Sequence, residues 1–523
     1  MPDGRVALVL HAHLPFVRHP EHPEVLEERW LFEAITESYL PLLDVLDRQE
    51  RDGVPARLTL SLSPTLLAML ADSLLRARYR RHLDTLITLG GQEVERTATE
   101  PAWHRCATLY RTRLMWAREA FLDRWEQDLV AAFRGLEDRG RVELATTAAT
   151  HAVLPLLSSV PASVRAQIAV GMAEHARHFG RAAPGFWLPE CAYEPGLDAE
   201  LARAGVRWTV LDTHGLTHAT PQPVYGVYAP VACPSGVAAY GRDPDSATEV
   251  WSAECGYPAD PWYRDFHRDI GFDLPAERLG HFASRTRRTA TGFKYHRITG
   301  PGPHKEPYDP DRASERVAAH AAHFVTVRLA QIERLRHAME HSPVIVCPYD
   351  AELFGHWWFE GPQWLDAVLR TIAATPGIAA ISLTDDLVAR PAVQAVEPAA
   401  STWGWRGHHA VWLGPANDWV YPDLHAAADR LVRLCRSTPW DGASRRALTQ
   451  ALRELLLAQA SDWAFMMARD TAVEYATRRT VEHLRASRVL CDSVERAAVD
   501  MRLVADLESR APLFPTLDLR VLD

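Results

Sequence analysis

The chain has 523 residues, of which 47% are hydrophobic and 24% charged, and its formal net charge is −10 at pH 7. This length exceeds one simple hydrophobic core and predicts a large domain accompanied by a smaller one. The negative charge argues against nucleic acid or an anionic membrane as the main partner, because their phosphates would repel it. No apolar run approaches the roughly 20 residues that cross a bilayer, and the apolar run in the first ten residues is too short for a signal peptide. We therefore expect a cytoplasmic globular protein.

Cysteine, tryptophan and histidine usage narrows the class further. The seven cysteines are odd in number and scattered without a CxxC pair, which is typical of a reduced intracellular protein and excludes a cysteine-rich zinc module. Seventeen tryptophans and 24 histidines are unusual counts. Many tryptophans stand beside Gly, Pro and Asp without a helical period, which favours platforms for the flat faces of sugars over plain core filling.

Short apolar runs alternate with helical periodicity through the first three quarters of the chain. Strands are predicted at 5–10, 58–62, 141–146, 185–188, 208–212, 344–347 and 378–383. The alternation indicates parallel βαβ units. An open doubly wound sheet would also fit, but no GxGxxG or GxxxxGK[ST] motif supports a nucleotide site. Acids and histidines at successive strand ends favour a barrel instead.

Three segments interrupt this alternation. Helical, charged sequence at about 66–139 predicts a helical insertion. Residues 225–311 lose periodicity and are rich in Gly, Pro, Asp and aromatics, which predicts a lid or substrate-binding excursion. The Pro- and Ala-rich stretch 391–401 predicts a boundary between a catalytic domain, 1–395, and a helical domain, 396–523.

Two strand ends carry an acid among aromatic rings. Asp350 follows the 344–347 run and precedes Phe354, Trp357 and Trp358, and Glu190 follows Phe186 and Trp187. Desolvation by such rings raises the pKa of a carboxyl group toward proton-donor duty. Two acids in this setting are what glycoside chemistry requires. His11 and His13 follow the first strand, and a period of two places them on the same side.

Five segments resemble glycoside hydrolase family 57 and, within it, the 1,4-α-glucan branching enzymes. In chain order they are HAHLPF at 11–16, ELATTAATH at 143–151 with LPLL at 154–157, WLPECAY at 187–193, YDAELFGHWW at 349–358 and QASDWAF at 459–465. Lid sequences at 235–243 and 292–299 are also similar to those of branching-type members. The resemblance implies an α/β fold: an incomplete (β/α)7 barrel with a helical insertion and a C-terminal α-helical domain.

The resemblance also implies roles for individual residues. Glu190 would be the nucleophile and Asp350 the acid/base of a retaining mechanism, with Glu352 as the main rival to Asp350 or else a supporting acid. Residues implied to contact the α-glucan substrate are His11, His13, His151, Tyr240, Trp262, Phe272, Trp403, Trp412 and Asp462. For each histidine a purely structural role is the alternative, and for Trp403 and Trp412 it is packing between the two domains.

The implied activity is cleavage of α-1,4 links and formation of α-1,6 branches through a covalent glycosyl-enzyme, without a cofactor or metal. Hydrolysis of α-glucan or 4-α-glucanotransfer on the same scaffold remains open, since only the acceptor differs. His-x-His at a strand end is also a zinc-ligand spacing, which would recruit His151 and Asp212. A non-catalytic glucan-binding protein is the alternative from another class.

Overall fold

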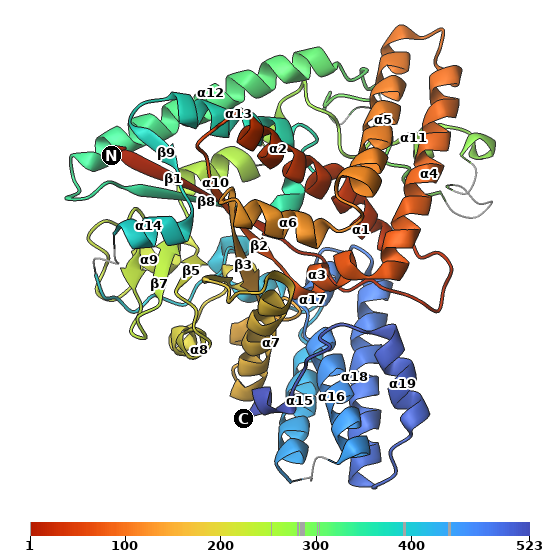
Figure 1. Ribbon diagram of the computed structural model, residues 1–523, viewed down its shortest axis with the longest axis vertical. Helices are drawn as coiled ribbons and strands as arrows, with labels where there is room; N and C mark the ends of the chain where they lie inside the picture. Colours follow the sequence, from red (N-terminus) through yellow and green to blue (C-terminus); the bar gives the residue numbers. More distant parts are fainter. Residues whose placement is uncertain are drawn as a thin grey trace.

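A parallel sheet curled into an incomplete barrel forms the centre of the computed structural model (Figure 1). The structure describes residues 2–523 except 253, 280, 281, 283–287, 301, 303, 391–393 and 438–440. Its described strands are β1 (Gly4–Ala12), β2 (Leu58–Leu62), β3 (Val142–Thr147), β4 (Gly185–Trp187), β5 (Trp208–Leu211), β6 (Val231–Ala232), β7 (Ala238–Gly241), β8 (Val344–Asp350) and β9 (Ile378–Ala380).

The strand order is β6-β7-β5-β4-β3-β2-β1-β8, with β9 beside β1. Every pairing is parallel except that of the short β6 with β7. The path from β7 to β8 therefore holds seven parallel strands in the described chain, and its two ends meet at one parallel bridge between Arg242 and Val346. This confirms the predicted incomplete (β/α)7 barrel.

Side chains along each barrel strand alternate between the interior of the barrel and the layer of helices around it. In β1, Ala7 and Val9 join the cluster that fills the barrel, whereas Val6, Leu8 and Leu10 face the surrounding helices. All nine residues of β1 are buried, as expected for a strand covered on both faces. His11 lies in the same strand, and the inward series Ala7 and Val9 leads to it.

Helices cover the barrel and extend it at both ends. They are α1 (Glu28–Ala34), the π-helix η1 (Ile35–Tyr39), α2 (Leu40–Arg51), α3 (Pro64–Ala71), α4 (Ser73–Arg96), α5 (Pro101–Glu119), α6 (Leu129–Asp138), α7 (Pro161–Phe179), α8 (Leu197–Arg203), α9 (Thr213–Thr217), α10 (Pro244–Trp251), α11 (Ile270–Asp273), α12 (Pro310–Arg336), α13 (Gly361–Ala374), α14 (Leu383–Ala389), α15 (Val420–Ser437), α16 (Gly442–Ala458), α17 (Ser461–Ala468), α18 (Val473–Glu495) and α19 (Met501–Arg510). Figure 1 shows the α4–α5 hairpin at one end and α15, α16, α18 and α19 gathered at the other. None of the described helices combines the length and apolarity of a bilayer span.

The lid predicted at 225–311 starts before the irregular segment that the structure shows. Residues 231–251 form β6, β7 and α10, and β7 is a parallel strand of the barrel, so the irregular excursion starts only after Trp251. The four residues of β7, Ala-Ala-Tyr-Gly, form no long apolar run and include no β-branched residue, so the sequence does not predict this strand. Pro391, the first residue of the predicted domain boundary, lies outside the described residues.

Candidate active site

The carboxyl ends of the barrel strands bring together the site residues that the sequence predicts. In the register of β1 with β8, His11 lies directly opposite Asp350. Beyond β4 the chain turns through Pro189–Cys191, and Glu190 adopts a left-handed backbone conformation with φ of 62°. His151 is also left-handed, with φ of 60°. Such conformations in non-glycine residues are each destabilising by on the order of 1–3 kcal/mol and are concentrated at functional sites.

Glu190 is held by donors from two distant parts of the chain. The indole Nε1 of Trp403 donates to Oε2 at 2.8 Å, and the Ser461 hydroxyl donates to Oε1 at 3.4 Å. Burial raises the pKa of Glu190 to about 8, and the charge of Asp350 adds to this, whereas the hydrogen bond from Trp403 lowers the pKa. The two donors stabilise the carboxylate form in a site where burial disfavours it.

Asp350 differs from Glu190 in having no hydrogen-bond partner for its carboxyl group within the described chain. Burial raises its pKa to about 6, while the charges of His13 and Arg242 act in the opposite direction. Between about pH 6 and pH 8 the two acids hold one proton, which these values place on Glu190 in the substrate-free protein.

Glu352, the rival of Asp350, is anchored from two sides. Its Oε1 accepts a hydrogen bond from the Tyr39 hydroxyl and another, of 3.1 Å, from the backbone N–H of His13. Burial raises the pKa of Glu352 to about 8. These contacts favour a supporting role for Glu352 over proton transfer to a substrate.

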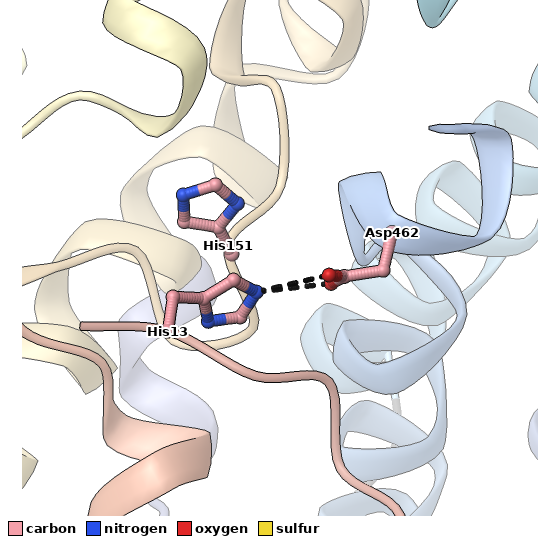
Figure 2. Close-up of side chains that lie close together, drawn as sticks. All are labelled: His13, His151 and Asp462. Atoms are coloured by element: carbon pink, nitrogen blue, oxygen red, sulfur yellow. Dashed lines mark hydrogen bonds and ion pairs between the residues drawn. The ribbon is translucent and has the colours of Figure 1, made fainter. Parts of the chain in front are cut away.

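Three histidine rings stack beside the acids. The rings of His13 and His151 lie 4.0 Å apart at 17°, and His11 stacks on Trp187 at 4.7 Å. Figure 2 shows His13 pointing at Asp462 of α17, with Nε2 3.0 Å and 3.2 Å from the two carboxyl oxygens. The C-terminal helices thus reach the barrel mouth.

Hydrogen bonds already occupy most of these ring nitrogens. His11 and His151 share a contact of 2.9 Å between their Nε2 atoms, and their Nδ1 atoms lie 3.2 Å and 2.8 Å from the hydroxyls of Ser61 and Ser461. Burial lowers the pKa of both His11 and His151 well below the usual range, so both rings are neutral. A direct contact of either ring with sugar requires one of these bonds to exchange, whereas His13 keeps Nδ1 without a partner in the described chain.

The site does not favour a metal ion. Among the described residues, one candidate ligand group appears here, His13, His151 and Asp462, with ligand atoms within 4.8 Å of one another. Nitrogen lone pairs lie in the ring planes, so two nearly parallel rings direct them side by side and not toward one tetrahedral centre. Asp212, the other ligand of the zinc hypothesis, contacts His214 at 3.3 Å and Arg242 at 3.7 Å instead.

The predicted aromatic platforms have different outcomes. Trp403 binds Glu190 and meets Trp187 and Trp251 edge to face at 5.1 Å and 6.0 Å. Trp412 is 2% exposed and packs with Val153 and Ala464, which supports packing between barrel loops and the C-terminal helices, the alternative to a sugar platform.

Tyr240 corrects a second prediction. It is fully buried inside the barrel, where its hydroxyl donates to the Leu383 carbonyl at 3.0 Å and the Asp386 carboxylate at 3.1 Å. Tyr240 therefore does not belong to a lid. Trp262 lies under the guanidinium groups of Arg297 and Arg312, and Phe272 is exposed in α11. The described chain contains no ring contact or hydrogen bond that links either residue to the acids.

Sequence reasoning missed four residues of the site. Trp187 stacks on the His11 ring, and Ser461 forms hydrogen bonds with both His151 and Glu190. The charge of Arg242 lowers the pKa of Asp350, and the Tyr39 hydroxyl donates a hydrogen bond to Glu352. Trp187 and Ser461 stand within quoted motifs beside predicted residues, which was a usable signal. Tyr39 lies in a helical stretch far from any motif, and no sequence pattern pointed to it.

Comparison with known proteins places the chain in a family. Residues 7–384 match the sequence profile of glycosyl hydrolase family 57, and residues 423–522 match that of the 1,4-alpha-glucan branching enzyme C-terminal region. A 1,4-alpha-glucan branching enzyme from Thermococcus kodakarensis is 33% identical over 97% of this chain and 77% of its own length.

Solved structures agree on the fold over the whole chain. The α-amylase AmyC from Thermotoga maritima is 41% identical, with a TM-score of 0.93 and coverage of 100% of this chain and 99% of its own. The family 57-type branching enzyme from Pyrococcus horikoshii is 32% identical, with a TM-score of 0.89 and coverage of 99% and 97%. The barrel, the paired acids at its mouth and these matches lead to one conclusion: the chain belongs to glycosyl hydrolase family 57.

Proposed function

We propose that the protein is a retaining α-glucan transglycosylase, a 1,4-α-glucan branching enzyme that cleaves α-1,4 links and forms α-1,6 branches. The observation that carries the proposal is the pairing of Glu190, which has two hydrogen-bond donors, with Asp350, which has none in the described chain. Such asymmetry suits one carboxylate nucleophile and one proton-holding acid. The C-terminal profile match and the names of the two branching enzymes support the choice of reaction.

In the first step, Glu190 attacks the anomeric carbon of the glucose unit at the cleavage point. The bond from that carbon to the leaving glucan oxygen breaks while its bond to the Glu190 oxygen forms, and Asp350 gives its proton to the leaving oxygen. In the substrate-free protein the pKa values of about 8 for Glu190 and about 6 for Asp350 leave the proton on Glu190 at pH 7, so this proton must pass to Asp350 before the attack. The donors Trp403 and Ser461 favour that transfer because they stabilise the Glu190 anion.

In the second step, the 6-hydroxyl of another glucan chain attacks the same carbon. Asp350 takes the hydroxyl proton, the bond to Glu190 breaks, and the α-1,6 link forms with the original configuration. Water competes for the same intermediate, so the branch yield depends on how well the site excludes water.

We further propose that two parts of the chain share the site. In this view a catalytic domain, 1–395, supplies Glu190 and Asp350, while a helical domain, 396–523, supplies Trp403, Ser461 and Asp462. The contacts of Trp403 with Glu190 and of Asp462 with His13 support the division, because both join the two parts at the acids.

Hydrolysis is the second candidate. The α-amylase AmyC resembles this chain over its full length at 41% identity, and hydrolysis uses the same two acids with water as acceptor. Counting new α-1,6 links against new reducing ends separates the two outcomes.

Glu190→Gln and Asp350→Asn test the proposed pair. We expect each variant to lose at least about a thousandfold in turnover of amylose because each removes one half of the double displacement. Unchanged circular dichroism and retained amylose binding are the controls. Near-normal turnover by either variant contradicts the assignment, and an inactive wild-type protein that binds amylose supports the non-catalytic alternative.

A further inference from the structure

A π-helix lies against the loop that carries the candidate acid/base. In η1 the N–H of Leu40 bonds to the carbonyl of Ile35, five residues back, where an α-helix would bond four back. Isolated π-turns of this kind occur frequently at functional sites. The strand β8 ends at Asp350, and the chain then turns through Ala351–Leu353 toward His356.

Three contacts dock this loop on the π-helix. The Tyr39 hydroxyl donates to Glu352, and His356 Nδ1 lies 2.6 Å from the Glu37 carboxylate. Gly355, with φ of 114°, allows the closest approach, since a Cβ there would lie 1.8 Å from the Glu37 carbonyl oxygen. The π-helix therefore fixes the position of the loop directly after Asp350.

Glu352 links the π-helix to His13 through hydrogen bonds. The same oxygen that accepts from Tyr39 also accepts from the backbone N–H of His13, and the His13 ring bonds to Asp462. A chain of hydrogen bonds thus runs from the π-helix through Glu352 and His13 to α17. Tyr39 is fully buried, and the two acids beside it, Asp350 and Glu352, are half-buried.

We propose that Tyr39 and Glu352 are positioning residues, a hydrogen-bonded pair that fixes the backbone of His13 beside Asp350, and that Glu352 does not itself transfer a proton to or from the substrate. The inference rests on the proposed function in taking Asp350 as the acid/base. It assigns a role to Tyr39 and resolves the rivalry between the two acids of the Asp-Ala-Glu sequence.

The surroundings of Glu352 fit this role. Three titratable groups face it: Tyr39 from η1, Asp350 from β8, and His13, whose backbone N–H reaches it from the segment after β1. Burial raises the pKa of Glu352 to about 8, so its carboxyl group is neutral at pH 7. A glutamine then has the same charge and nearly the same shape, and it keeps an oxygen for both donors.

The amide variant Glu352→Gln separates positioning from proton transfer. We expect Glu352→Gln to keep kcat within about threefold of wild type at pH 7, and Glu352→Ala to lose about a hundredfold, because only alanine removes the acceptor oxygen. Tyr39→Phe should lower kcat about tenfold with KM within about twofold, since it removes one of the two anchoring bonds. Tyr79→Phe is the matched control: it removes another buried hydroxyl beside η1, one that bonds Thr36 and not Glu352, and we expect wild-type kcat.

Total turnover, the sum of new α-1,6 links and new reducing ends on amylose, is the readout at pH 7 on the full-length protein. An inactive wild-type enzyme contradicts the proposed function and not the positioning role. With an active wild type, a Glu352→Gln variant as inactive as Glu352→Ala overturns the inference, because a positioning acceptor survives as an amide and a proton-transferring acid does not. An unchanged kcat in Tyr39→Phe equally overturns it. Recovery of activity from alanine to glutamine at position 352 supports it.

Discussion

Trp403 donates a hydrogen bond of 2.8 Å from its indole nitrogen to the carboxylate of Glu190, 213 residues earlier in the chain. The backbone N–H of Trp403 also bonds to the Glu190 carbonyl at 3.0 Å. These two bonds fix both the backbone and the side chain of the proposed nucleophile from a segment beyond the barrel strands. The segment after the barrel is therefore part of the catalytic arrangement that we propose.

Trp403→Phe keeps a ring in place but removes the donor. We expect kcat to fall about 10–100-fold, because a carboxylate nucleophile loses a preorganised hydrogen bond. Loss of the donor also raises the pKa of Glu190, the higher of the two values, so the alkaline limb of the pH–rate profile should move to higher pH. Trp412→Phe is the control, since the Trp412 indole nitrogen has no partner in the described chain and its activity should persist. Equal losses of kcat in the two variants would show that the size of the side chain, and not the hydrogen bond to Glu190, determines activity.

The pH dependence of turnover follows from the two raised pKa values. We expect kcat/KM on amylose to peak between about pH 6 and pH 8, where Glu190 and Asp350 together hold one proton. Below this window both acids are protonated and no nucleophile remains, and above it both are ionised and no proton donor remains. Activity that stays flat from about pH 4 to pH 10 would rule out this pair.

Glu190→Gln should make the folded protein more stable in neutral and alkaline solution. Burial raises the pKa of Glu190 from 4.5 to about 8, and an acid with a raised folded pKa destabilises the native state increasingly from about pH 4.5 to about pH 8. Removing it should recover on the order of 2–4 kcal/mol above pH 8, or about 2–4 °C in Tm for a chain of this size.

Little difference is expected at about pH 4, where the group is protonated in both states. Thermal unfolding at about pH 4 and pH 8.5 gives the measurement. Glu95→Gln, at an exposed position of α4, should leave Tm unchanged at both. A Glu190→Gln variant with wild-type Tm at the higher pH would mean that burial does not act on this carboxyl group.

Tyr240→Phe should alter stability and not product choice. The substitution leaves the Asp386 carboxylate and the Leu383 carbonyl with one hydrogen bond fewer inside the barrel, which should lower the free energy of unfolding by about 1–2 kcal/mol. Because Tyr240 lies in the barrel core, the ratio of branches to reducing ends should match wild type. A changed ratio at unchanged Tm would restore the lid role that the structure argues against.

Much of the barrel could be predicted because its strands are continuous apolar runs. The strand predicted at 58–62 coincides with β2, and those at 5–10 and 344–347 fall within β1 and β8. β7 is not predicted because it has four residues, of which tyrosine alone favours a strand, and Tyr240 is therefore placed in a lid by the sequence. A strand is predicted from an apolar run or from alternating apolar and polar residues, and four residues are too few to show either pattern.

The acids could be found from sequence, but their partners could not. Glu190 and Asp350 stand at strand ends among rings, a local signal, and the resemblance to family 57 assigned their roles. The donors to Glu190 come from Trp403 and Ser461, more than 200 residues away, and Tyr39 reaches Glu352 through a π-turn. Such contacts join residues that are far apart in the chain, so no local stretch of the sequence predicts them.

Product analysis on amylose distinguishes branching from hydrolysis. Purified wild-type protein, treated with EDTA, would be incubated with amylose, and proton NMR would count α-1,6 links and new reducing ends. We expect branch signals to appear and to outnumber reducing ends, and both to disappear in Glu190→Gln and Asp350→Asn. Reducing ends without branches would contradict the proposed transfer and establish hydrolysis, and inactivity restored by zinc would contradict the metal-free mechanism.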